Sequence, residues 1–139
     1  MRAPGARRPL LLAAVLAGTA GCVQAVPDCP APLRRMEAAE LFLGRAIPGG
    51  GMVDDAAWEA FVDQEVLARF PDGFTVVEAD GRWRGPADGK AVRERTMVIR
   101  VLGDDTRTGA RAAEVADAYR RRFAQESVLR VAGPVCAAF

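Results

Sequence analysis

The segment from Val92 to Leu102 (VRERTMVIRVL) constrains the fold of this chain most, because it reads as one continuous β-strand. Residues of an extended strand point alternately to opposite faces of the sheet. One face would carry Met97, Ile99 and Val101, and the other Thr96, Val98 and Arg100. The end of the segment is apolar on both faces, which predicts a central strand with cover on both sides. The rest of the chain must therefore supply neighbouring strands and helices.

The composition excludes several classes of function. The 139 residues are enough for one domain, and they include no histidine. A Ser-His-Asp triad, a Cys-His pair and a histidine-based zinc site are therefore excluded, and we expect no metal and no cofactor. The chain has 19 basic and 18 acidic residues, so its net charge is small and predicts no basic face for nucleic acid.

Residues 1–21 have the pattern of a secretory signal peptide. Three arginines (Arg2, Arg7, Arg8) precede the apolar run LLLAAVLA of residues 10–17, which is too short to span a membrane. Thr19, Ala20 and Gly21 bring small residues up to Cys22, as in a bacterial lipoprotein signal. We therefore expect cleavage before Cys22, lipid on this cysteine, and an exported protein anchored to the membrane in the cell envelope. The alternative is ordinary cleavage after Ala25.

The next segment, residues 22–35, is rich in proline and reads as a tether before the folded domain of residues 36–139. With Cys22 lipidated, Cys29 and Cys136 remain as an even pair in an oxidising compartment. A disulfide between them would close a loop of roughly 100 residues and stabilise the fold by on the order of 4 kcal/mol.

Hydrophobic periodicity divides the folded domain into six elements. Strands are predicted at residues 36–47, 74–84, 92–102 and 127–132, and helices at residues 55–70 and 109–124. The apolar stripe of the first helix comprises Trp58, Phe61, Val62, Val66 and Phe70. The stripe of the second comprises Ala112, Val115, Ala116, Tyr119 and Phe123.

The order βαββαβ predicts an α+β fold, a ferredoxin-like sandwich with two helices on one sheet face. Right-handed crossovers then give an antiparallel sheet with the strand order 4-1-3-2. The last strand would lie antiparallel to the first, which brings Cys136 close to Cys29. This topology supports the disulfide independently of the cysteine count.

Strand alternation assigns side chains to the two faces of this sheet. The face beneath the helices should carry Ala39, Leu41, Leu43, Met97, Ile99, Val101, Leu129 and Val131. The open face should carry Glu40, Phe42, Thr96, Val98, Arg100, Val128 and Arg130. Glu40 would then lie between Arg130 and the third strand, in a cluster of ion pairs. Such a cluster is either a solvent-facing ladder of cross-strand pairs or the floor of a pocket or dimer interface.

Several motifs resemble a bacterial family of unknown function. They are ELFLG (40–44), RFPDGFTVVEADGRWR (69–84), VRE (92–94) and RFAQESVLRV (122–131). The resemblance is to domain-of-unknown-function family 3574, many of whose members look like secreted proteins or lipoproteins, and it spans about residues 36–139. It implies no activity and no catalytic residues. It does direct attention to polar residues within the motifs, namely Glu40, Trp83, Arg84, Glu94, Gln125, Glu126 and Ser127.

Each of these residues also has a purely structural interpretation. Trp83 could cap the core beneath a hairpin, and Arg84 could pair with Glu94 across it. The three residues from Gln125 to Ser127 could satisfy backbone groups between a helix and a strand.

Two functional hypotheses remain open. The first is an exported lipoprotein with a binding or structural role, whose open sheet face contacts a partner, including a second copy of itself. The second is a small cofactor-free enzyme, in which Glu40 acts as acid or base and Arg100 or Arg130 stabilises an anion in a pocket formed by a dimer. The candidate binding residues are Glu40, Arg100, Arg130, Trp83, Arg84 and Glu94.

Overall fold

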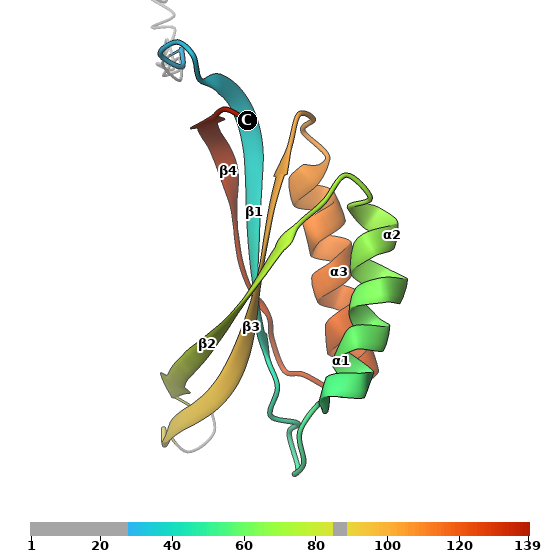
Figure 1. The fold of residues 1–139 in the computed structure, drawn as a ribbon. Helices are drawn as coiled ribbons and strands as arrows, with labels where there is room; N and C mark the ends of the chain where they lie inside the picture. Colours follow the sequence, from blue (N-terminus) through green and yellow to red (C-terminus); the bar gives the residue numbers. More distant parts are fainter. Residues whose placement is uncertain (1–27, 85–88) are drawn as a thin grey trace, which may run out of the picture.

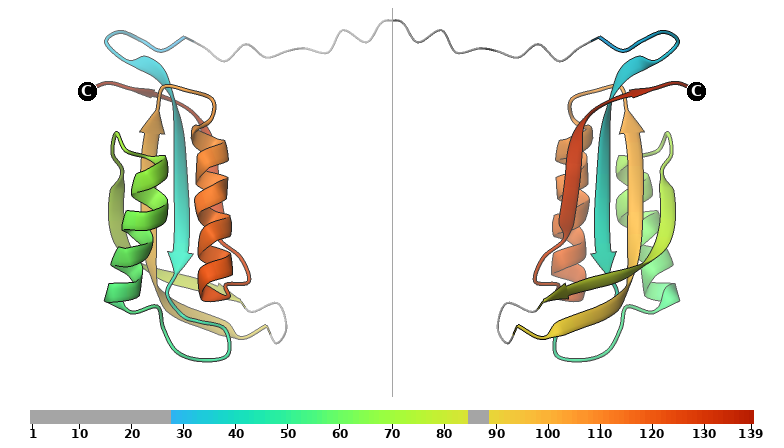
Figure 2. Two further views of the ribbon diagram at one scale, coloured as in Figure 1. Left: turned by 90° about the vertical axis from the view of Figure 1, so that its right-hand side faces the viewer. Right: turned by 90° about the vertical axis from the view of Figure 1, so that its left-hand side faces the viewer.

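The computed structural model describes residues 28–84 and 89–139 and shows a four-stranded sheet with helices packed on one face (Figure 1). The elements in chain order are β1 (Arg34–Gly44), α1 (Asp55–Phe61), η1 (Val62–Val66), α2 (Leu67–Arg69), β2 (Thr75–Arg84), β3 (Ala91–Gly103), α3 (Thr108–Phe123) and β4 (Leu129–Ala137). In Figure 2, right, the view is onto the uncovered face, with the helices behind the strands.

The sheet order is β2-β3-β1-β4 with every neighbouring pair antiparallel, which confirms the predicted sandwich and its strand order. β1 lies between β3 and β4. It begins two residues before the predicted strand and ends at Gly44 rather than at Ile47. β4 runs past Pro134 to Ala137, and an edge strand tolerates this proline because its nitrogen need not donate to a ladder.

The first predicted helix is confirmed, but it is interrupted by a π-helical turn. α1, η1 and α2 follow each other without a break, and the π-helical turn is η1. The helix begins where Asp54 accepts a hydrogen bond from the Ala57 backbone N–H at 2.7 Å, a conventional N-cap. The sequence pattern contains no signal for the π-helical turn.

The core lies between the helices and the sheet, as predicted from both helix stripes. Ala39, Leu41, Leu43, Met97, Ile99 and Val101 are all buried beneath the helices. Aromatic rings of α1 and α3 pack edge to face, with the Phe61 centroid 5.0 Å from that of Tyr119 and 5.9 Å from that of Phe123. Packing of this kind fixes the helical layer on one face and leaves the other face free.

The assignment of faces on β4 is wrong for the predicted strand. The register sets Leu129 opposite Phe42, Arg130 opposite Leu41 and Val131 opposite Glu40. Leu129 and Val131 therefore lie on the open face and are 61% and 50% exposed, whereas Arg130 lies on the helix side of the edge. Val128 on one alternation and Leu129 and Val131 on the other are all apolar, so the pattern could not decide which of them face the helices. In the structure, Val128 packs against the core.

The two ends of the domain meet, as predicted. Arg35 pairs with Cys136 in the β1–β4 register, and Cys29 and Cys136 form a disulfide with a Cα–Cα distance of 5.5 Å. The predicted signal peptide and Cys22 lie outside the described residues. In the part that is described, no helix has the length and apolar character needed to cross a bilayer.

Removing the disulfide should destabilise the domain without changing its fold. In the double variant Cys29→Ala/Cys136→Ala, a loop of 107 residues is no longer closed in the unfolded chain. We expect the free energy of unfolding to fall by about 4 kcal/mol, measured by guanidinium denaturation. Wild type in reductant should match the double variant, and the double variant should not respond to reductant. Equal midpoints for oxidised and reduced wild type would contradict this assignment.

Candidate functional site

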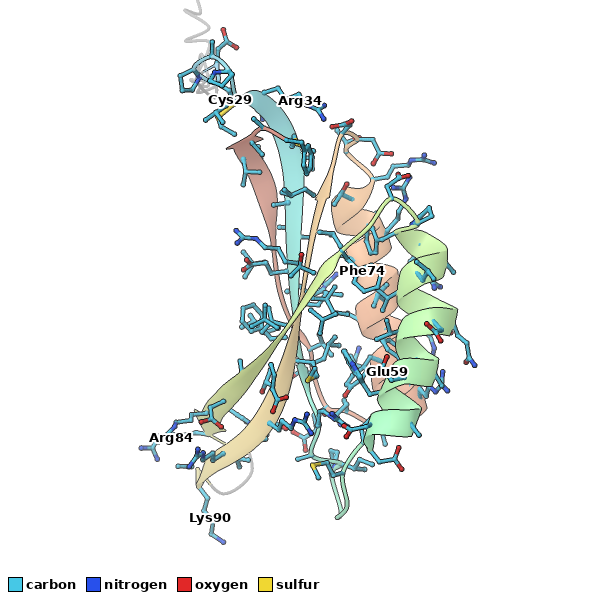
Figure 3. All side chains as sticks on the ribbon, viewed as in Figure 1. Cys29, Arg34, Glu59, Phe74, Arg84 and Lys90 are labelled. Carbon is cyan, nitrogen blue, oxygen red and sulfur yellow. A yellow bond between two sulfur atoms is a disulfide. The ribbon has the colours of Figure 1, made fainter. Side chains whose placement is uncertain are left out.

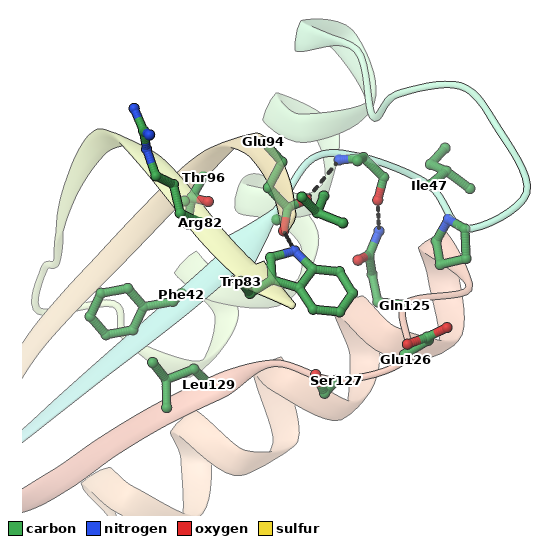
Figure 4. Close-up of a pocket in the computed structure, with 15 residues that line it drawn as sticks. Phe42, Ile47, Arg82, Trp83, Glu94, Thr96, Gln125, Glu126, Ser127 and Leu129 are labelled. Atoms are coloured by element: carbon green, nitrogen blue, oxygen red, sulfur yellow. Dashed lines mark hydrogen bonds between the residues drawn. The ribbon is translucent and has the colours of Figure 1, made fainter. Parts of the chain in front are cut away.

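A cavity of about 530 Å³ opens on the uncovered face, where β1 ends and β4 begins (Figure 4). One wall is the β2–β3 hairpin, and the other is the segment that connects α3 to β4. Its lining consists of Phe42, Gly44, Ala46, Ile47, Pro48, Gly81, Arg82, Trp83, Val92, Glu94, Thr96, Gln125, Glu126, Ser127 and Leu129. A volume of this size is in the range typical of small-molecule sites.

Both oxygens of the Glu94 carboxylate are hydrogen-bonded in this cavity. Its Oε1 accepts a hydrogen bond from the Trp83 indole Nε1 at 2.9 Å, and its Oε2 accepts one from the Ala46 backbone N–H at 3.2 Å (Figure 4). Both donors are neutral, and no described residue forms an ion pair with this carboxylate. The glutamate therefore holds the indole in place, and none of the described cationic side chains pairs with its negative charge.

Two glycines make room for the Glu94 side chain. Gly44 on β1 lies so close that a Cβ there would approach the Glu94 Cδ to 2.6 Å. Gly81 on β2 lies opposite Glu94 in the strand register, and a Cβ there would collide with the Thr96 hydroxyl. The absence of side chains on both neighbouring strands opens a notch in the sheet, and the Glu94 carboxylate fills its Gly44 side.

The backbone beneath the notch is held from the helical layer. The Tyr119 hydroxyl on α3 donates to the Gly44 carbonyl at 2.9 Å, and Gln125 Nε2 donates to the Ala46 carbonyl at 2.8 Å. Burial raises the pKa of Tyr119 well above its ordinary value; Arg45 opposes this, and Glu94 adds to it. Tyr119 therefore stays a neutral donor over the physiological pH range.

Arg45 anchors the same stretch of chain from within. Its side chain is 1% exposed, its Nε donates to the Val53 carbonyl at 2.7 Å, and its Nη1 lies 2.8 Å from Asp55 Oδ1. The hydrogen bond and charge of Arg45 lower the pKa of Asp55, with Arg95 adding to the effect. The peptides of residues 44–46 are thus fixed on both sides, so the wall of the cavity that they form is rigid.

The described residues that line the cavity carry a net negative charge, from Glu94 and Glu126 against Arg82. Glu126 has no hydrogen bond or ion pair to any residue that the structure describes. Arg82 lines the cavity, but its guanidinium points away from Trp83 and Glu94 (Figure 4). The remaining walls are mainly apolar, including Phe42, Leu129 and the face of Trp83.

The structure brings some of the sequence-predicted residues together and separates others. Trp83 and Glu94 meet, but Arg84 does not pair with Glu94; its Nη1 donates to the Gly89 carbonyl at 3.0 Å. The proposal that Trp83 caps the core is also wrong, because it is 43% exposed on the open face. Within the described ranges, no group of three or more acidic or cysteine side chains could hold a metal.

Glu40 does not belong to the cavity. It lies opposite Arg100 in the β1–β3 register and forms an ion pair with it at 3.1 Å. Its neighbour on β4 is Val131 rather than Arg130, because the β1–β4 register sets Arg130 opposite Leu41. An acid–base role of Glu40 between two arginines therefore loses its geometric basis, and Arg130 is not a residue of the open face.

The motif residues Gln125, Glu126 and Ser127 all line the cavity, as does Thr96. Gly44, Gly81 and Ala46 were not predicted from the sequence as parts of a site. The only sequence signal for the first two was a glycine within a strand pattern, which marks either a bulge or a close approach.

Fold and site together define a class: a small α+β domain of the ferredoxin-like type with a pocket on its open sheet face. The chain belongs to the family described as "Protein of unknown function (DUF3574)", whose model matches residues 38–139. No curated protein sequence matches it.

Solved structures with a similar fold come from a phage enzyme. A phage SAM lyase in complex with S-methyl-5'-thioadenosine has a TM-score of 0.57 and 14% identity, over 75% of this chain and 90% of that chain. A phage SAM lyase in the apo state has a TM-score of 0.53 and 16% identity, over 76% and 92% of the two chains. Identities this low establish similarity of fold alone.

Substituting Gly44 should disturb the site directly. In Gly44→Ala the new Cβ displaces the Glu94 carboxylate, which then loses its bonds to Trp83 and Ala46. We expect a loss of about 1–2 kcal/mol in the free energy of unfolding and a change in Trp83 fluorescence. Gly133→Ala on β4 is the matched control, because a Cβ there meets nothing within 4 Å. Identical denaturation curves for the two variants would show that the notch does not need a glycine.

Proposed function

We propose that this protein is an exported binding protein that takes a small cationic ligand with a flat apolar group into the cavity beside Trp83. The observation that carries the proposal is the Glu94 carboxylate, which is fixed by two neutral N–H donors and has no cationic partner among the described residues. A ligand cation would supply the missing charge.

The chemistry of the walls supports both parts of such a ligand. Each carboxylate oxygen of Glu94 accepts one hydrogen bond and can accept another. An ammonium or similar cationic donor of the ligand can therefore form a charge-assisted hydrogen bond with it. Trp83, Phe42 and Leu129 offer apolar and aromatic surface for a flat ring. An indole face also attracts a cation directly.

An enzyme that acts on such a cation is the second candidate. The fold neighbours are described as SAM lyases, and S-adenosylmethionine combines a sulfonium cation with a flat adenine ring. In an elimination of this kind the carbon–sulfur bond breaks and sulfur keeps the electron pair as a neutral thioether. Glu94 would take a proton from the carbon next to the broken bond, and the electrons of that carbon–hydrogen bond would form a carbon–carbon double bond in the remaining fragment. This alternative uses the same cavity, formed within one chain, and replaces Glu40 by Glu94 as the acid or base.

A matched pair of ligands tests the preference for cations. Phenethylamine and phenylacetate share a ring but carry opposite charges, so we expect the amine to bind at least about tenfold more tightly. Binding is measured by calorimetry and by Trp83 fluorescence, with Trp83→Phe identifying the signal of this indole. Glu94→Gln should remove the preference, whereas Glu59→Gln, an exposed glutamate on α1, should retain it.

Equal binding of the two compounds to wild type would contradict the cationic preference, and binding of neither would contradict the site. S-adenosylmethionine in the same assay separates the two candidate functions. Release of S-methyl-5'-thioadenosine, lost in Glu94→Gln, would favour the enzyme; binding without release favours the binding protein.

We further propose that the chain is exported and anchored to the envelope membrane through lipid on Cys22. A disulfide that links the two ends of the domain suits an oxidising compartment and supports export. The tether between Cys22 and β1 would let the domain stand off the membrane surface.

The anchor is tested on the full chain expressed in a bacterium. Wild type should incorporate labelled palmitate and enter the detergent phase, because several acyl chains hold a protein stably to a bilayer. Cys22→Ala should do neither and should appear in the aqueous phase, with its disulfide intact. A mature wild-type protein that begins at Val26 would show ordinary cleavage instead.

A further inference from the structure

The face of the sheet without helices carries an apolar row that crosses all four strands. The strand register places Val77 beside Val98, Val98 beside Phe42, and Phe42 beside Leu129. At the two edges, Val77 is 52% exposed and Leu129 is 61% exposed. Side chains project from this face with no described element packed over them (Figure 3).

A second row, next to the first, places opposite charges at its centre. Thr75, Arg100, Glu40 and Val131 follow one another across β2, β3, β1 and β4. Arg100 and Glu40 form an ion pair at 3.1 Å, and their side chains are 62% and 27% exposed. The pair is thus open to a further charged group from above.

Such a face differs from the solvent-facing side of an ordinary antiparallel sheet. A face in contact with water normally alternates to polar residues, and contiguous apolar surface on a monomer marks an interaction site. Here the polar residues at the centre are one cation and one anion, side by side.

We propose that this face docks a second copy of the chain, related by a two-fold axis that runs parallel to the strands between β1 and β3. Rotation about this axis sets β1 over the partner's β3 and β4 over the partner's β2. Glu40 then faces Arg100 of the partner subunit, and Phe42 faces the partner's Val98. Leu129 faces Val77 of the partner subunit in the same way. Every contact occurs twice, as an isologous interface requires.

The arrangement of charge is what selects a second copy in this orientation. Each Glu40 would lie between its own Arg100 and the partner's Arg100, which converts two exposed ion pairs into one network of four charges. A two-fold axis across the strands at the apolar row would instead set Glu40 against the partner's Gly44 and leave the charges without new partners. Of these two axes, only the one parallel to the strands therefore sets apolar residues against apolar residues and opposite charges against each other.

The proposed dimer goes beyond the proposed ligand binding, but its apolar row overlaps the lining of the cavity. Phe42 and Leu129 belong both to the apolar row and to the lining of the cavity. A face four strands wide is at the small end of specific interfaces, so we expect a dissociation constant in the micromolar range.

Charge reversal tests the dimer without requiring any ligand. Sedimentation of residues 23–139 over about 5–500 µM should show wild type passing from monomer to dimer, as for micromolar affinity. Glu40→Arg alone and Arg100→Glu alone should each remain monomeric, because like charges then face each other across the axis. An equimolar mixture of these two variants should dimerise, since the arginine introduced in one chain then faces the glutamate introduced in the other. The double variant Glu40→Arg/Arg100→Glu should also dimerise.

Arg130→Glu is the matched control, because it makes the same charge change on the edge strand but on the helix side, opposite Leu41. It should dimerise as wild type does. The proposal is overturned if wild type stays monomeric throughout this range, or if either single variant dimerises like wild type. It is equally overturned if the two single variants fail to associate when mixed, because the mixture requires both to be folded and complementary.

Discussion

The register of β1 between its two antiparallel neighbours is the constraint on which the rest of this structure depends. Pairing with β3 places the buried residues Leu41 and Ile99 side by side beneath the helices and leaves Glu40 and Arg100 on the open face. Pairing with β4 brings Cys136 to the start of the domain, where Cys29 closes it. Because side chains alternate along a strand, a slip of one residue in either pairing would exchange the two faces. Core, disulfide and open face are therefore three consequences of a single alignment.

The cavity lies at the end of β1, where its regular pairing with the neighbouring strands stops. At Gly44 the strand ends, and the glycines on either side of Glu94 remove the side chains that would otherwise fill the row. A carboxylate then occupies sheet surface where a partly buried charge is costly unless it is hydrogen-bonded. Trp83 and Ala46 supply those bonds, while Tyr119 and Gln125 fix the peptides behind them. The site is therefore preorganised by backbone and packing, and no described residue forms an ion pair with the Glu94 carboxylate.

The sequence predicted those features that rest on strong periodicity. The helix stripes follow from patterns in which one face is clearly apolar and the other is not. The strand order follows from the order of these elements and right-handed crossovers, and the disulfide from that order and the cysteine count. It failed at β4, where Val128, Leu129 and Val131 give apolar residues on both alternations and only packing decides. It also could not place Trp83 on Glu94, because these residues belong to different strands and meet only through the hairpin register. The family resemblance drew attention to Trp83 and Glu94, which line the cavity, but also to Glu40, which does not. The notch itself depends on how three strands meet in space.

Sharing of Phe42 and Leu129 between the cavity and the apolar row has a thermodynamic consequence for the two proposals taken together. A partner seated on the row covers these side chains, and a ligand in the cavity contacts the same side chains. Any ligand that binds dimer and monomer with different affinity must shift the monomer–dimer equilibrium by the same factor, because coupling between two binding events is reciprocal. The sign of this coupling depends on which side chains the ring of the ligand covers. A ligand confined to Trp83 and Glu94 would leave dimerisation unchanged. A ligand that reaches Leu129 would either add to the dimer interface or compete with it. The distance that the ligand's ring extends from Glu94 toward Leu129 therefore determines whether ligand binding and dimerisation are coupled.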